Sequence, residues 1–235
     1  MAYGSTPTET LDIFPAEKLC SPIHIFFHGG YWHSLSSRDF SFMAEGLVRN
    51  GITAVLVNYA LCPAVTIDEI VRQARSAVAW IFHNAESIGG NPERITVSGH
   101  SAGGHLTGML LSVDWKKDFN LPPNILKGLL SFSGLFDLAP FPFSWLQPKL
   151  QLSSADVLRN SPLLLKPKCA PPVTLAVGAD ESNEFHRQSK NYSVFLKKNG
   201  VHANYLSIHG KNHFNIIHDF LGDGGALCKQ ICAWS

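Results

Sequence analysis

The sequence contains no run of about eighteen apolar residues, so no membrane-spanning helix is expected. Its start, MAYGSTPTETLDIFPAEK, has neither a basic beginning nor an apolar centre, and we expect no secretion signal there. Neither sign of charge is in excess: the formal net charge is +1, which gives no reason to expect nucleic acid or an anionic membrane as a partner. Blocks of like charge, low-complexity tracts and internal repeats are also missing. These absences favour an ordinary globular domain.

Cysteine is scarce and unpatterned. The five cysteines are an odd number and do not form a disulfide framework, so we expect reduced thiols in a cytoplasmic protein. Two of them are four residues apart near the carboxyl end, and without a second pair at zinc spacing they indicate helix packing. The eleven histidines show no consistent ligand spacing with acidic residues, so we expect no metal site. The cysteines are Cys20, Cys62, Cys169, Cys228 and Cys232.

Length and residue order predict one α/β domain. A chain of 235 residues with 45% hydrophobic residues can bury roughly 70% of its unfolded surface. Apolar, β-branched runs alternate with segments of helical periodicity, which predicts a mostly parallel sheet with helices on both faces. The expected strands are 23–28, 52–59, 94–99, 125–134, 171–180 and 203–210, and the clearest helices are 40–51, 66–89 and 183–200. The Pro- and Phe-rich segment 135–169 reads as an insertion over the active site.

One motif stands where a strand becomes a helix. The sequence RITVSGHSAGGHL places Ser101 between Gly99 and Gly103, after an apolar strand and before small, helix-compatible residues. Gly-x-Ser-x-Gly in this context is typical of a tight turn that exposes a nucleophilic serine. A helix that begins behind the serine would also favour developing negative charge. The alternative is a glycine-rich turn with a bystander serine.

A nucleophilic serine needs a base and an acid that orients the base. In folds with this turn, the partners follow in the order serine, acid, histidine. Asp180 stands directly after the apolar strand VTLAVG and is our predicted acid, with Glu181 as the rival. His213 lies in the loop after the last strand and is our predicted base, with His209 as the rival.

An oxyanion site is predicted in FFHGGYWHS, which follows an early strand. Glycines let the main chain approach a substrate closely, so the amides of Gly30 and Tyr31, together with that of Ala102, would face a carbonyl oxygen as it gains charge. A plain turn is the alternative. Trp32 and the aromatic segment 141–145 could stack on an aromatic substrate, although aromatic side chains also build cores.

Taken together, HGGYW, VNYALCP, GHSAGGHL and VGADESNEFHRQS resemble the kynurenine formamidase (arylformamidase) group of α/β hydrolases, over nearly the whole chain. The resemblance implies the α/β-hydrolase fold and hydrolysis of N-formyl-L-kynurenine to L-kynurenine and formate, without metal or cofactor. It implies Ser101, Asp180 and His213 as the triad, and Gly30 and Tyr31 as oxyanion donors.

The expected partner is a small-molecule substrate, cleaved through a formyl-enzyme intermediate. A homodimer is compatible with the sequence, which does not determine the oligomeric state. Because a fold does not fix a substrate, a general carboxylesterase acting on small acyl esters is the alternative function. A non-catalytic ligand-binding relative is a further alternative, although such a protein has no need for a histidine behind a serine.

Overall fold

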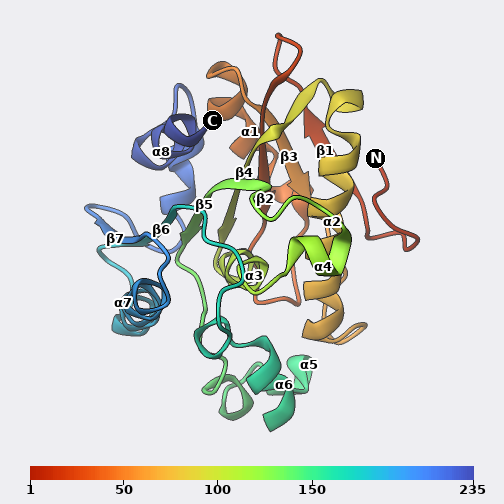
Figure 1. The fold of residues 1–235 in the computed structure, drawn as a ribbon. Coiled ribbons are helices and arrows are strands. Elements are labelled where there is room, and N and C mark those ends of the chain that lie inside the picture. Colours follow the sequence, from red (N-terminus) through yellow and green to blue (C-terminus); the bar gives the residue numbers. More distant parts are fainter.

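The computed structural model describes residues 1–235, and its centre is a seven-stranded sheet (Figure 1). The strand order is β1-β3-β2-β4-β5-β6-β7, and every neighbouring pair is parallel except β1 with β3. The strands are β1 Leu11–Phe14, β2 Ser21–Phe27, β3 Thr53–Val57, β4 Gly90–His100, β5 Leu126–Phe132, β6 Val173–Gly178 and β7 Ala203–Ile208. This is the expected α/β-hydrolase architecture, with an antiparallel edge strand that the sequence reading did not identify.

The inner strands are buried on both faces because helices cover both sides of the sheet. All residues of β2 and β3 are buried, which is why their sequences read as continuous apolar runs. On β2, Ile23, Ile25 and Phe27 pack into one core cluster, while Phe26 packs into the cluster on the opposite face. The alternation follows the two-residue period of a strand.

Helices α1 and α8 lie on one face of the sheet, and α2, α3 and α7 lie on the other (Figure 1). The helices are α1 Ala44–Arg49, α2 Ile67–Asn84, α3 Ala102–Leu110, α4 Trp115–Phe119, α5 Gln147–Leu150, α6 Ser154–Asn160, α7 Asn183–Lys198 and α8 Ala226–Trp234. None of them is both long enough and apolar enough to cross a lipid bilayer.

Helix α2 begins where the sequence predicted it. The side chain of Thr66 accepts a hydrogen bond from the amide of Glu69, which satisfies one of the free donors of the first turn. The buried residues that follow recur at three- and four-residue spacing and include Ile67, Ile70 and Val71. The expected helix at 40–51 is divided instead into a 3₁₀ helix, Ser37–Met43, and the short α1.

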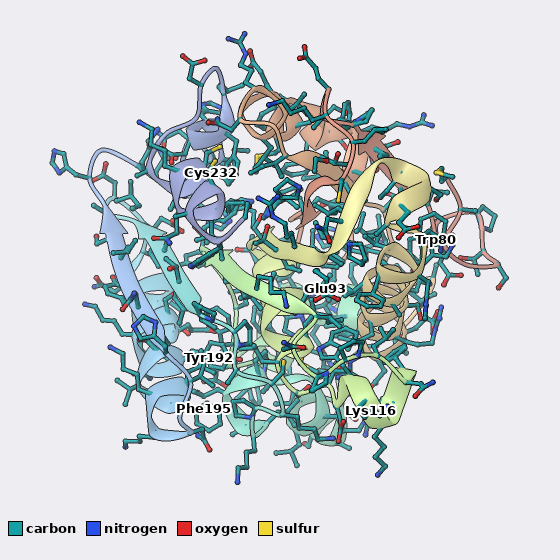
Figure 2. The ribbon with its side chains drawn as sticks, turned by 45° about the horizontal axis from the view of Figure 1, so that its top comes forward. Trp80, Glu93, Lys116, Tyr192, Phe195 and Cys232 are labelled. Atoms are coloured by element: carbon teal, nitrogen blue, oxygen red, sulfur yellow. The ribbon has the colours of Figure 1, made fainter.

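Helix α7 is held against the sheet by Tyr192. This side chain is 1% exposed and lies 4.3 Å from the ring of Phe136, nearly parallel to it. Its hydroxyl donates to the carbonyl of Gly108 on α3 over 3.3 Å. Figure 2 shows Tyr192 on the side of α7 that faces the body of the molecule. The middle of α7 is therefore fixed relative to α3.

Residues 135–169 contain only short helices, namely Phe141–Phe143, α5, α6 and Pro162–Leu164. In Figure 1, α5 and α6 lie together at one end of the molecule, beyond α3. Gln188 of α7 accepts the amides of Phe136 and Asp137, at 2.7 Å and 2.9 Å, and so fixes the beginning of this segment.

Candidate active site

Ser101 occupies a strained turn between β4 and α3. Its φ of 56° and ψ of −115° lie in a region that residues other than glycine rarely adopt. The two flanking glycines permit the turn through close approach: a Cβ on Gly99 would lie 2.2 Å from the carbonyl oxygen of Gly103, and one on Gly103 would lie 1.9 Å from that of Phe27. The motif therefore contains glycine at both positions because no side chain fits there.

His213 contacts the serine, as predicted. The hydroxyl of Ser101 lies 3.2 Å from Nε2 of His213, which follows β7 in the loop before the 3₁₀ helix Ile216–Phe220. The rival His209 is exposed and makes no side-chain hydrogen bond. His100, next to the serine, donates from Nε2 to the main-chain carbonyl of His213 over 2.9 Å, which fixes that loop.

The acid that contacts His213 is Glu181, and the prediction of Asp180 is wrong in this respect. His213 donates from Nδ1 to Oε2 of Glu181 over 2.8 Å. Oε1 of the same carboxylate accepts from the amide of Gly178 at 2.8 Å and from the hydroxyl of Ser133 at 2.5 Å. The Glu181 side chain is completely buried.

Asp180 is turned away because residues 179–180 form a tight turn at the end of β6. Its amide donates to the carbonyl of Lys211 over 3.0 Å, and its side chain points to solvent. The longer side chain of Glu181 folds back to reach His213. Ser133 was not identified from the sequence, since nothing in its neighbourhood distinguishes it from a core serine of β5.

The main chain at residues 29–32, here called the glycine loop, is left-handed at three consecutive positions. The φ values are 110° at Gly30, 50° at Tyr31 and 60° at Trp32. For the two aromatic residues this conformation costs about 1–2 kcal/mol each. The amides of Gly30 and Tyr31 donate to no atom of the chain. Ala102 begins α3, where an amide has no acceptor within the helix.

The glycine loop lies beside the serine. A Cβ on Gly29 would be 3.3 Å from Cβ of Ser101. The carbonyl of Gly30 accepts the amides of His33 and Ser34, both at 3.1 Å, which closes the turn. Beneath it, the His28 ring stacks on Tyr59 at 4.1 Å, and the Tyr59 hydroxyl donates to the His28 carbonyl over 2.7 Å.

Trp32 does not line a pocket, contrary to the expectation that it contacts substrate. The left-handed backbone turns its indole into the core, where the residue is 0% exposed. Its Nε1 donates to Nδ1 of His105 over 3.1 Å, and its ring lies edge-on to Phe141 at 5.4 Å. The neighbouring Tyr31 side chain points into the cavity instead.

A cavity of about 240 Å³ opens between the glycine loop and the start of α7; Ser101 and His213 do not line it. Its walls come from Tyr31, from the segment 135–169 and from the start of α7. Phe185 lies between the cavity and the catalytic residues: it lines the cavity, and its ring lies 4.4 Å from that of His213. The lining residues are Tyr31, Leu135, Pro140, Phe141, Ser144, Trp145, Leu146, Ser182, Glu184, Phe185 and Gln188.

Burial keeps His28, His100 and His105 neutral. Desolvation lowers the pKa of His100 to about 3, and it lowers those of His28 and His105 to about 4. These residues therefore act as uncharged hydrogen-bonding groups. No group of three or more His, Cys, Asp and Glu side chains is arranged to hold a metal ion.

The chain from Glu181 through His213 to Ser101 can transfer a proton. A histidine oriented by a carboxylate can take the serine proton as the oxygen attacks a carbonyl, and unpaired amides nearby can receive the resulting oxyanion. The cavity would hold the rest of the substrate.

Known proteins share both the fold and the sequence. A family model of the alpha/beta hydrolase fold matches residues 24–217. Kynurenine formamidase of Danio rerio is 33% identical over 97% of this chain and 78% of its own length, and that of Salmo salar is 34% identical over the same shares. A candidate thioesterase from a Silicibacter species superposes with a TM-score of 0.86 at 26% identity, over 98% of this chain and 83% of that one. The carboxylesterase EstE1 superposes with a TM-score of 0.78 at 18% identity, over 99% and 91%, which shows the shared fold alone.

The fold and these matches define a hydrolase of the α/β-hydrolase class. Within that class, the chain belongs to the kynurenine formamidase group.

Proposed function

We propose that this protein hydrolyses N-formyl-L-kynurenine to L-kynurenine and formate. The observation that carries the proposal is the hydrogen-bonded chain Glu181–His213–Ser101 beside an aromatic cavity, in a chain similar to kynurenine formamidases. Ser101 is the nucleophile, His213 the base and Glu181 the orienting acid. The amides of Gly30, Tyr31 and Ala102 are the oxyanion donors.

The reaction begins when Ser101 Oγ attacks the formyl carbon and His213 Nε2 takes the hydroxyl proton. The carbonyl oxygen becomes an oxyanion, which the three amides stabilise; each such donor contributes about 10²–10³ in rate. The protonated His213 then gives its proton to the aniline nitrogen, the C–N bond breaks, and L-kynurenine leaves. The formyl group remains on Ser101 as an ester.

Water completes the cycle. His213 takes a proton from the water as its oxygen attacks the formyl ester, and the same amides receive the second oxyanion. The ester bond then breaks, the proton returns from His213 to Ser101 Oγ, and formic acid leaves and ionises to formate. Glu181 holds the imidazole of His213 in one orientation and stabilises the imidazolium.

The cavity suits the leaving part of this substrate. A formyl group carries only hydrogen on its carbonyl, so the acyl side needs little space, whereas the leaving side must accept an aryl ketone and an amino-acid head. Tyr31, Phe141, Trp145 and Phe185 offer aromatic walls, and Glu184 is the carboxylate in the lining. In this assignment, the segment 135–169 is an insertion of a single domain and forms the outer wall of the active site.

The test compares N-formyl-L-kynurenine with p-nitrophenyl formate, acetate and butyrate on one preparation. We expect turnover of N-formyl-L-kynurenine, and a fall in kcat/KM of roughly 10–200-fold for each lengthening of the acyl group on the nitrophenyl esters. Equal turnover of the three esters, with N-formyl-L-kynurenine untouched, would contradict the proposal and indicate a general carboxylesterase.

A further inference from the structure

A buried chain of hydrogen bonds connects the glycine loop to the core. Trp32 donates from Nε1 to Nδ1 of His105 over 3.1 Å, and the two rings meet edge to face at 5.0 Å and 89°. His105 Nε2 in turn lies 2.7 Å from the carbonyl oxygen of Asn160. All three residues are at most 2% exposed.

The chemistry of the three groups determines which atom donates and which accepts in each hydrogen bond. An indole N–H can only donate, so Nδ1 of His105 must be the acceptor. The proton of a neutral imidazole then sits on Nε2, which donates to the carbonyl of Asn160. His105 is thus held in one tautomer by a partner on each side. Asn160 is itself fixed, because its amide group donates to Asp68 at 3.1 Å and to the carbonyl of Asp156 at 3.0 Å.

His105 also contacts the nucleophile turn. Its own amide donates to the carbonyl of Ser101 over 3.1 Å, one helical turn after the serine. A single residue therefore connects to both halves of the site: its main chain to Ser101, and its side chain to the glycine loop that carries the Gly30 and Tyr31 amides. This arrangement fixes the separation between the serine and those amides.

The glycine loop needs such an anchor. Tyr31 and Trp32 hold left-handed backbone conformations that neither side chain favours. Trp32 is additionally held by its carbonyl, which accepts the amide of Cys62 over 2.8 Å. A tryptophan bonded at both its main chain and its indole prevents the loop from relaxing to an ordinary conformation.

We propose that Trp32 and His105 are positioning residues, which hold the glycine loop in register with Ser101 so that its free amides are ready to receive the oxyanion. The inference rests on the proposed function only in taking these amides as the oxyanion donors; it applies to any ester or amide substrate of Ser101.

The competing explanation is that Trp32 simply fills the core, and Trp115 supplies the matched control. Trp115 on α4 is 1% exposed, but its Nε1 has no hydrogen-bond partner. The substitutions W32F and W115F therefore remove the same atoms from two buried sites, and only W32F breaks a hydrogen bond to the glycine loop.

The experiment measures kcat and KM for p-nitrophenyl acetate, the thermal midpoint, and inhibition by an aryl trifluoromethyl ketone. Ser101 Oγ adds to the carbonyl carbon of this ketone. The carbonyl oxygen then becomes an oxyanion, which the amides of Gly30, Tyr31 and Ala102 would receive. For W32F we expect kcat to fall about 10- to 100-fold, less than when a donor is lost outright, with KM nearly unchanged. The inhibition constant should rise by the same factor as kcat/KM falls.

The remaining variants test the hydrogen bond itself. H105F removes the acceptor and should lower kcat like W32F, whereas H105N keeps an acceptor near Nδ1 and should restore most of the loss. Because both changes break the same bond, W32F in the H105F background should add little. W115F should lower the thermal midpoint without changing kcat or the inhibition constant.

Three outcomes would overturn the inference: unchanged kcat and ketone affinity in W32F, equal kcat losses in W32F and W115F, or fully additive effects of W32F and H105F. If H105F does not fold, W32F and H105N decide alone. Failure of wild-type protein to cleave N-formyl-L-kynurenine, with the ester still hydrolysed, would refute the substrate and leave this test intact.

Discussion

Oε2 of Glu181 lies 2.8 Å from Nδ1 of His213, while the carboxylate of the preceding residue, Asp180, is exposed to solvent. Two adjacent acids therefore have unequal access to the base. The turn after β6 determines which acid reaches His213. It directs the Glu181 side chain inward, where the Gly178 amide and the Ser133 hydroxyl also donate hydrogen bonds to its carboxylate.

The first prediction is that Glu181→Gln loses activity and Asp180→Asn does not. An amide at position 181 that donates towards Nδ1 would force the wrong imidazole tautomer, so kcat should fall by up to about 10⁴. Asp180→Asn should stay close to wild type, because this side chain does not contact His213. Steady-state kinetics on N-formyl-L-kynurenine checks both variants, and the reverse ranking would restore Asp180 as the acid.

Ser101 and His213 should act as a unit. Ser101→Ala, His213→Ala and the double variant should lose activity to a similar extent, by on the order of 10⁶ in kcat. The matched control is His209→Ala, an exposed histidine of the same loop, which should retain activity. Losses that multiply in the double variant would mean that the two residues act independently.

The aromatic wall should matter for large leaving groups only. Trp145 lines the cavity although it is 73% exposed, whereas Phe143, 92% exposed, does not line it. Trp145→Ala should lower kcat/KM for N-formyl-L-kynurenine by about 10-fold, the effect of losing roughly 1.4 kcal/mol of stacking, and should leave p-nitrophenyl formate nearly unaffected. Phe143→Ala should affect neither substrate. An equal loss of kcat/KM on both substrates in Trp145→Ala would contradict the prediction, because it would mean that Trp145 affects the chemical step and not the binding of the leaving group.

Stability should fall in weak acid because of buried histidines. Burial lowers the pKa of His24 to about 3, so between that value and the ordinary 6.5 the unfolded chain binds a proton that the native protein does not. The free energy of unfolding therefore decreases as pH falls from about 6.5, by about 1.4 kcal/mol per pH unit for each such histidine. His28, His100 and His105 have lowered pKa values for the same reason and add to the slope.

Urea unfolding between pH 7 and pH 5 measures this slope. His24→Asn should be less stable at pH 7, because it disturbs the hydrogen bonds of the imidazole to Thr96 and Ser98. The slope of its unfolding free energy against pH should be smaller than that of wild type by the contribution of one proton. His202→Asn, at an exposed position, should leave the slope unchanged. A slope in His24→Asn identical to that of wild type would contradict the assignment.

The sequence predicted the fold and most of the site because those features follow from short-range patterns. Strand-to-helix alternation gave the parallel sheet, and Gly-x-Ser-x-Gly gave Ser101 with its turn. The acid was misassigned because residue order identifies the end of β6 but not which of two neighbouring side chains the turn directs inward. Trp32 was misassigned because aromatic character alone does not tell a pocket wall from a core residue; that depends on φ at Tyr31 and Trp32.

Strand β1 and helix α4 were missed for a similar reason. Leu11–Phe14 has only four residues, of which one is fully buried, so its apolar pattern is too short to distinguish. Its place is fixed by pairing with β3 across the sheet, Leu11 opposite Val57. Helix α4 is five residues long and depends on the cap formed by Asp114.

The two walls of the cavity differ in how freely their residues can be substituted during evolution. Phe185 belongs to the same short stretch as Glu181 and lies against His213, so a new side chain there changes substrate fit and proton transfer together. Trp145, on the wall formed by residues 135–169, instead lies edge-on to the ring of Tyr31, with centroids 6.1 Å apart. Adaptation to a new leaving group is therefore cheapest at exposed positions of residues 135–169 such as Trp145, where selection can reshape the substrate range and leave the reaction intact. Asn160 of the same segment is not such a position, because its carbonyl holds His105.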